Sequence, residues 1–276
     1  DVLSVVLPKG AGFDQVLVVG MGAAEKLDVI AFENLGGKIL AALKSISAES
    51  ASLFLDMPKN VETGEAEAAS ALAAGVRLRD YNFDKYKSKD LSGDRKKSKT
   101  LSSVTIVTTA SAKAQTLFKD EEALAQGVHL ARDLVNEVAN VLYPQSYAAI
   151  IKKELGALGV QVEILDDKKM ENLGFGAHLA VGMGSIRPPR VVIMRWNGTS
   201  GATGSGKGAK PSKTDAPIAF VGKGVTFDTG GISIKPAAGM EDMKWDMGGA
   251  GAVAGAMLAL ARRKAKANVV GICGLV

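Results

Sequence analysis

The sequence has few of the residues that build disulfides and the commonest metal sites. Its 276 residues include one cysteine and two histidines, so no intramolecular disulfide can form. The cysteine, Cys273, has apolar neighbours, and we interpret it as a small buried hydrophobic residue rather than a nucleophile. No His-Glu-x-x-His pattern occurs, which excludes a thermolysin-like zinc site. His129 and His178 have no motif partner, and we interpret both as structural residues.

Long apolar runs are also absent. Charge or glycine interrupts each run well before about 18 residues, so the sequence predicts neither a transmembrane helix nor a membrane partner. No positively charged start is followed by an apolar segment of the signal-peptide kind, so we expect a cytoplasmic protein. Because the sequence opens at Asp1 without a methionine, we also expect that its natural start has been trimmed.

The charge balance has no strong excess of either sign. The formal net charge is +5 and the sequence pI is about 9.1, which bears on solubility and on weak attraction to polyanions rather than on the fold. A basic stretch over 85–99 is the feature that would favour nucleic-acid binding. Aromatic residues are thinly interleaved with it, so we regard nucleic acid as an unlikely partner.

The first part of the chain alternates strand and helix patterns. We expect strands over 16–20 and 101–109, with helices over 33–47 and 62–78 between them. Small apolar residues recur at three- and four-residue spacing in the second helix and predict its buried face: Ala66, Ala69, Ala73 and Val76. Strands that alternate with helices indicate an α/β domain, which we assign to residues 1–119.

An amphipathic helix over 120–137 is expected to connect this domain to a second one, within a linking segment over 120–143. Its apolar stripe consists of Leu124, Val128, Ala131, Leu134 and Val135. Acidic residues at its start favour the positive end of the helix dipole. Pro144 ends the linking segment.

Residues 144–276 read as a second α/β unit. The patterns predict, in chain order, helix 145–158, strands 160–165 and 190–196, a surface loop over 197–216, strand 217–222, helix 249–266 and strand 268–273. The last strand is an apolar run of the kind that is buried in a parallel sheet.

The glycine-rich segment over 221–251 carries the chemistry. It follows an apolar strand, where α/β sheets usually place their sites, and it contains Lys223, Asp228, Lys235 and Asp246. The aspartates are hard oxygen ligands suited to Zn²⁺, Mn²⁺ or Mg²⁺. The spacing of the glycines fits neither a Walker A motif nor G-x-G-x-x-G, which argues against a phosphate loop. Spacing alone leaves a metal site and a structural loop as open alternatives.

The order of residues in this segment resembles the signature of the leucyl aminopeptidase family. That signature reads Gly-Lys-Gly-x-x-x-Asp-x-Gly-Gly-x-x-x-Lys, followed by Met-Lys-Trp-Asp-Met-Gly-Gly-Ala. Weaker similarity lies in Ala131-Arg132-Asp133-Leu134-Val135-Asn136-Glu137 and in Gly182-Met183-Gly184-Ser185 with Pro189-Arg190. One departure is Val138, where family members usually have proline. This position has no chemical role in the reading that the resemblance gives.

The resemblance implies a metal-dependent aminopeptidase that releases leucine-like N-terminal residues from peptides. It implies a macro-like N-terminal α/β domain, a linking helix and an α/β metallopeptidase domain, here over 144–276. Lys223 and Asp246 would ligate one divalent ion and Asp228 would bridge two, with Zn or Mn expected and Mg possible. Lys235 would polarise the scissile carbonyl and Met243 would line the substrate pocket. Family members are typically hexamers; the alternative function is a non-catalytic, DNA-binding regulatory role.

Two further family carboxylates and an arginine come from an Asn-Thr-Asp-Ala-Glu-Gly-Arg motif. That string does not occur in this sequence. We therefore expect the 276 residues to be a truncated form that lacks the C-terminal part of the catalytic domain.

Overall fold

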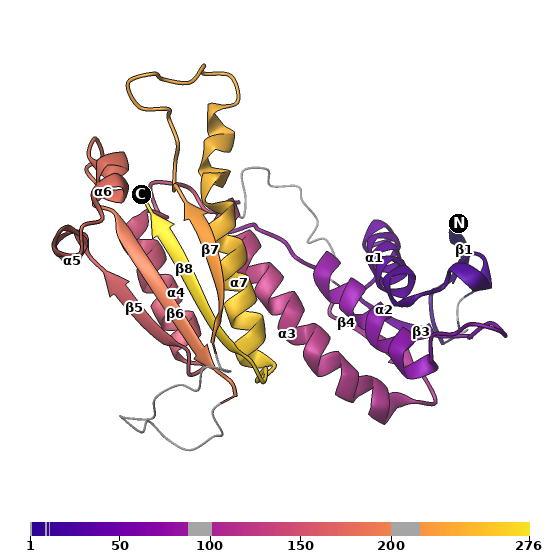
Figure 1. Ribbon diagram of the computed structural model, residues 1–276. Helices are drawn as coiled ribbons and strands as arrows, with labels where there is room; N and C mark the ends of the chain where they lie inside the picture. The colour runs from indigo at the N-terminus through magenta and orange to yellow at the C-terminus, as the bar shows by residue number, and fades with distance from the viewer. Residues whose placement is uncertain (1, 9, 11, 88–100, 200–215) are drawn as a thin grey trace. The chain divides into compact units, whose positions relative to one another are not determined.

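The computed structural model describes residues 2–8, 10, 12–87, 101–199 and 216–276 (Figure 1). The chain divides into two compact units, Asp1–Glu122 and Ala123–Val276. Both units combine helices with sheets, which confirms the predicted α/β class. Most of the basic stretch over 85–99 and of the loop expected over 197–216 lies outside the described residues.

The first unit contains two small sheets, packed with helices. Its elements are β1 (Val2–Val6), β2 (Gln15–Val19), the 3₁₀ helix η1 (Ala24–Lys26), α1 (Val29–Ser45), β3 (Ser50–Phe54), α2 (Glu65–Arg79), β4 (Ser103–Val107) and the start of α3 (Ser111–Asn136). Strands β1 and β2 form an antiparallel pair, whereas β3 and β4 are parallel. The predicted strands and helices of this region are present, but β1 and β3 are additional.

Helices α1 and α2 pack closely because glycines stand at their contact. A Cβ at Gly36 would lie 2.1 Å from the Leu72 carbonyl oxygen, and one at Gly75 would lie 1.8 Å from the Glu33 carbonyl oxygen. Phe32 and Leu72 are fully buried in the adjoining core. This close contact corrects the stripe expected on α2. Burial extends around most of the helix, while Ala73 and Val76 are only partly buried.

The second unit contains a four-stranded sheet in the order β5-β6-β8-β7. Its elements are the rest of α3, then α4 (Pro144–Gly156), β5 (Gln161–Leu165), α5 (Asp167–Asn172), α6 (Gly176–Gly182), β6 (Arg190–Asn197), β7 (Ile218–Gly224), the 3₁₀ helix η3 (Met240–Met247), α7 (Gly248–Arg262) and β8 (Asn268–Leu275). Strand β8 runs parallel to β7 but antiparallel to β6, so the expected parallel pairing is confirmed for β7 and wrong for β6. Its apolar run reflects a central position in a mixed sheet.

Alternate residues of the strands face two different layers. Val192, Met194 and Cys273 belong to the main core, to which residues of α4 and α7 also belong. Val191 belongs to a smaller cluster with Leu165 of β5 and Met170 of α5. Cys273 is completely buried, as its apolar neighbours predicted.

Helix α3 differs from the expected linking helix. It begins at Ser111 rather than near 120, and within the second unit it packs against α7. A Cβ at Gly127 would lie 2.4 Å from the Gly255 carbonyl oxygen, so the two backbones are in close contact. Leu134 is buried, but Leu124 is 43% exposed and lines an apolar groove between the two helices. None of the helices that the structure describes has the length and apolarity needed to cross a membrane.

Candidate metal centre

The candidate centre lies where β7 ends. Lys223 is the second-last residue of β7, and the chain then runs through a loop into η3 and directly on into α7. Gly222 allows β7 to approach the start of α7, since a Cβ there would lie 2.6 Å from the Gly249 carbonyl oxygen. The site therefore occupies the carboxyl end of a parallel strand, next to the N-terminus of a helix.

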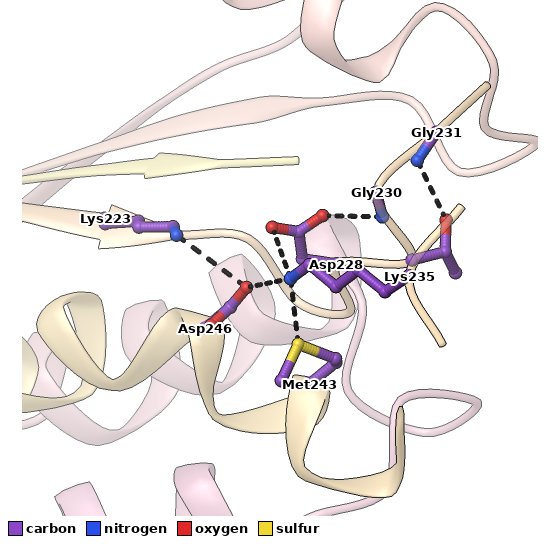
Figure 2. Close-up of polar contacts among 8 residues, drawn as sticks. Lys223, Asp228, Gly230, Gly231, Lys235, Met243 and Asp246 are labelled. Carbon is purple, nitrogen blue, oxygen red and sulfur yellow. Dashed lines mark hydrogen bonds and ion pairs between the residues drawn. The ribbon is translucent and has the colours of Figure 1, made fainter. Parts of the chain in front are cut away.

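Local hydrogen bonds hold the loop after β7. Gly230 and Gly231 have φ values of 92° and 78°, in the left-handed region that favours glycine. The Gly230 amide donates to Asp228 Oδ1 at 2.9 Å, and the Lys235 amide donates to the Thr229 carbonyl at 2.9 Å. These two bonds fold the loop back so that the side chains of Asp228 and Lys235 meet (Figure 2).

The 3₁₀ helix η3 supplies the other side of the centre. It starts after Gly239, whose φ is 77°, and it ends at Met247, which is completely buried in the main core. The Asp228 amide donates to the Met243 carbonyl at 3.4 Å, which ties η3 to the loop. The buried Met247 fixes the backbone beside Asp246.

Four charged side chains converge between the loop, the strand and η3 (Figure 2). Lys235 Nζ lies 3.1 Å from Asp228 Oδ2 and 3.5 Å from Asp246 Oδ2. It also donates to Met243 Sδ at 2.8 Å. Lys223 Nζ lies 3.7 Å from Asp246 Oδ2. The structure thus brings together all five residues that the sequence singled out.

The ion pair between Lys235 and Asp228 changes the pKa of both groups. The hydrogen bond from Lys235, followed by the one from the Gly230 amide, lowers the pKa of the Asp228 carboxyl. The same hydrogen bond to Asp228 raises the pKa of the Lys235 ammonium. About a third of each side chain is exposed, at 33% for Asp228 and 36% for Lys235. The pair is therefore partly exposed to solvent, and both groups stay charged at neutral pH.

The donors present fit a hard divalent cation. Two carboxylates point at one position from different elements, and the Lys223 nitrogen lies beside Asp246. Carboxylate oxygens with one nitrogen are acceptable ligands for Zn²⁺ or Mn²⁺. Over the described parts of the chain, no three His, Cys, Asp or Glu side chains gather at one place, and the candidate centre itself offers two carboxylates. The neutral form of Lys223 would have to complete the ligand set.

The histidines are placed elsewhere. His178 lies on α6, with its Nε2 atom 3.3 Å from the Arg190 carbonyl oxygen and its ring against Gly274 of β8. His129 lies on α3. One residue that the sequence did not single out is Lys244, whose ammonium contacts the Asn136 carbonyl. The sequence feature that could have pointed to Lys244 is its position inside the same motif, between Met243 and Asp246.

Two family models match the chain. The catalytic domain of the cytosol aminopeptidase family matches residues 129–276, and the N-terminal domain of the same family matches residues 1–90. The candidate centre lies entirely within the match to the catalytic domain.

Similar proteins carry names consistent with these matches. Probable cytosol aminopeptidases of Rhizobium johnstonii and Agrobacterium fabrum are each 50% identical over 274 residues, which is 99% of this chain and 52% of the relative. The chain thus spans about half the length of these relatives. The solved structure of the bottromycin maturation enzyme BotP in complex with Mn has a TM-score of 0.80 and 30% identity, and it covers 100% of this chain and 53% of its own. A mutant of tomato leucine aminopeptidase has a TM-score of 0.75 and 28% identity, covering 100% and 49%. This chain belongs to the cytosol aminopeptidase family.

Proposed function

We propose that the whole protein carrying these 276 residues is a metal-dependent aminopeptidase that releases leucine-like N-terminal residues from peptides. The observation that carries the proposal is the convergence of Asp228, Asp246 and two lysines at the carboxyl end of β7. Membership in the cytosol aminopeptidase family and the manganese complex of a similar structure support the same chemistry. No observation favours the non-catalytic, DNA-binding alternative.

The proposed cofactor is a pair of divalent ions, Zn²⁺ or Mn²⁺, with Mg²⁺ as a further candidate. Lys223, Asp228 and Asp246 would hold one ion, and Asp228 would also reach the second. When bound, such a pair supplies an acidified water and a Lewis acid for the scissile carbonyl. Lys223 would contribute the lone pair of its neutral amine, which lies beside Asp246.

The other site residues would act on the peptide. The hydrogen bond to Asp228 raises the pKa of the Lys235 ammonium. As a charged group, Lys235 would donate to the carbonyl oxygen as negative charge develops there. Met243 presents its thioether beside that ammonium, where a flexible, polarisable side chain suits an apolar first residue of the substrate.

The proposed setting of the enzyme is taken from the names of its relatives and from the family resemblance. We propose a cytoplasmic location, because the similar proteins are named cytosol aminopeptidases. A homohexamer is the proposed assembly, on the family resemblance alone. Peptides are the proposed partners, and neither membrane nor nucleic acid is part of the proposal.

A peptidase assay on the whole protein tests the proposal. The substrates are leucine p-nitroanilide and its N-acetylated form, each measured after chelation and after Mn²⁺ or Zn²⁺ has been added back. We expect hydrolysis of the free-amine substrate alone, its loss after chelation and its return with metal. Asp228→Asn should abolish the activity, whereas Lys152→Met, a change on the exposed face of α4, should not. Hydrolysis that survives both chelation and Asp228→Asn would refute the proposal.

A further inference from the structure

Lys244 lies between two residues of the candidate centre but points to a different partner. Its ammonium donates to the Asn136 carbonyl oxygen at 3.3 Å, whereas Met243 and Asp246 contact Lys235. The side chain of Lys244 is partly buried. The contact joins η3 to the end of α3, 108 residues earlier in the chain.

The position of that contact is favourable for a cation. Asn136 is the last residue of α3, and the last four carbonyls of a helix have no partner within it. These carbonyls form the negative end of the helix dipole, where an ammonium is stabilised. The Asn136 side chain adds a second tie, since its Nδ2 atom donates to the Arg132 carbonyl at 2.9 Å. The Lys244 ammonium therefore contacts a helix end that carries partial negative charge.

Within the second unit, helix α3 is held in place by close packing. Its backbone touches that of α7 where Gly127 meets Gly255, and Leu134 is buried in the main core. The 3₁₀ helix η3, in contrast, has weaker hydrogen-bond geometry than an α-helix. It is joined to α7 at one end and to the loop at the other. A tie from its middle to α3 limits how η3 can turn.

We propose that Lys244 is a positioning residue for the metal centre. By holding η3 against the C-terminus of α3, it keeps the Asp246 carboxylate and the Met243 thioether turned toward Lys235 and Asp228. Loss of the ammonium lets η3 rotate and moves Asp246 away from Asp228. The inference rests on the proposed function in taking Asp246 as a metal ligand, while the placement of η3 itself is independent of metal.

The experiment compares Lys244→Met, which keeps an apolar stem, with Lys244→Arg, which keeps the charge. Isothermal titration of the chelator-treated whole protein with Mn²⁺ gives the affinity, and Lys152→Met is the control. We expect Lys244→Met to weaken Mn²⁺ binding about 10- to 100-fold, as outer partners of metal ligands do. Lys244→Arg should restore most of the affinity, and the control should match the wild type. Circular dichroism checks folding, and Lys244→Gln replaces Lys244→Met if the latter does not fold.

A second measurement separates this proposal from the proposed function. Trp245 follows Lys244 in η3 and is 51% exposed, so its fluorescence and its quenching by acrylamide report the placement of η3 without metal. Subtraction of the Trp245→Phe spectrum removes the contribution of Trp196. We expect Lys244→Met to change both signals. If the wild type binds no Mn²⁺, the proposed function fails and the Trp245 signals decide the positioning role. Unchanged signals together with unchanged Mn²⁺ affinity would overturn the inference.

Discussion

The Lys235 ammonium lies 3.1 Å from the Asp228 carboxylate, at a point that the Asp246 carboxylate also reaches. It thus stands where the two carboxylates would share a cation. An ammonium in that position is a competitor for the carboxylates rather than a donor to a metal. Lys235 and the proposed metal ligands are therefore expected to respond differently to substitution.

Asp228→Ala should remove more metal than Asp246→Ala. Asp228 would reach two ions whereas Asp246 would reach one, so the loss of Asp228 affects both. Elemental analysis of each variant after dialysis against a low concentration of Mn²⁺ measures the difference, with Lys152→Met as the control. Equal metal content in Asp228→Ala and the wild type would show that the assignment of Asp228 is wrong.

Lys235→Ala should keep its metal but lose catalysis. Removal of a single donor to a developing oxyanion typically costs about 10²- to 10³-fold in rate. Because the interaction would be made in the transition state, kcat and kcat/KM should fall together. Steady-state kinetics on leucine p-nitroanilide, with metal content measured in parallel, test this expectation. A normal kcat would assign the polarising role to another group.

The core beneath the sheet should lose stability at alkaline pH. Burial raises the pKa of the Cys273 thiol from 9.0 to about 12, and burial also raises that of Tyr147. The folded state holds the thiol proton more tightly than the unfolded chain, so this contribution is complete below pH 9 and is lost progressively between pH 9 and 12. At pH 10.5 the loss attributable to Cys273 is roughly 2 kcal/mol.

Urea unfolding at pH 8 and pH 10.5 measures that loss, in the wild type and in Cys273→Ala. The alanine variant is less stable at both values because it leaves a cavity. Its further loss between the two values should nevertheless be smaller than that of the wild type. Parallel losses would show that the thiol does not contribute to the alkaline transition.

Gly127→Ala should disturb the contact between α3 and α7. The added Cβ would lie 2.4 Å from the Gly255 carbonyl oxygen, so one of the two backbones must move. Overpacking of this kind costs about 1–3 kcal/mol of unfolding free energy. Gly156→Ala in α4 is the matched control, since its Cβ would meet no atom within 4 Å. That control should be neutral or stabilised by up to about 1 kcal/mol. Equal stability of both variants would contradict the close packing.

The fold class was predictable because it depends on local patterns. The alternation of strands and helices indicates α/β units whatever their neighbours, and the helix expected over 249–266 is α7 with a shorter end. Strand direction was not predictable in the same way. The pairing of Val192 with Cys273 joins segments far apart in the chain and sets β6 antiparallel to β8. No local pattern encodes that pairing.

In the candidate site, too, features within one short segment were predictable and contacts between distant segments were not. Lys223, Asp228, Lys235 and Asp246 could be grouped from the sequence because they lie within one short segment that follows a strand. Their metal roles remain predictions. The contact of Lys244 with Asn136 could not be derived, since it depends on how the end of α3 meets η3. A lysine next to site residues gives no sign of whether it points inward or toward a distant helix end.

Asp246 precedes Met247, which is completely buried in the main core. A cation held by Asp246 would bind tightly only when the side chain of Met247 is buried in the core. Cation binding and folding of this part of the core would therefore be thermodynamically linked. Ligand binding to the folded state alone adds about 2.7 kcal/mol of stability at a hundredfold excess over Kd. The melting temperature would then rise with the fraction of protein that has bound metal. Substitutions in the core around Met247 would change the metal affinity even though the substituted residues do not contact the metal.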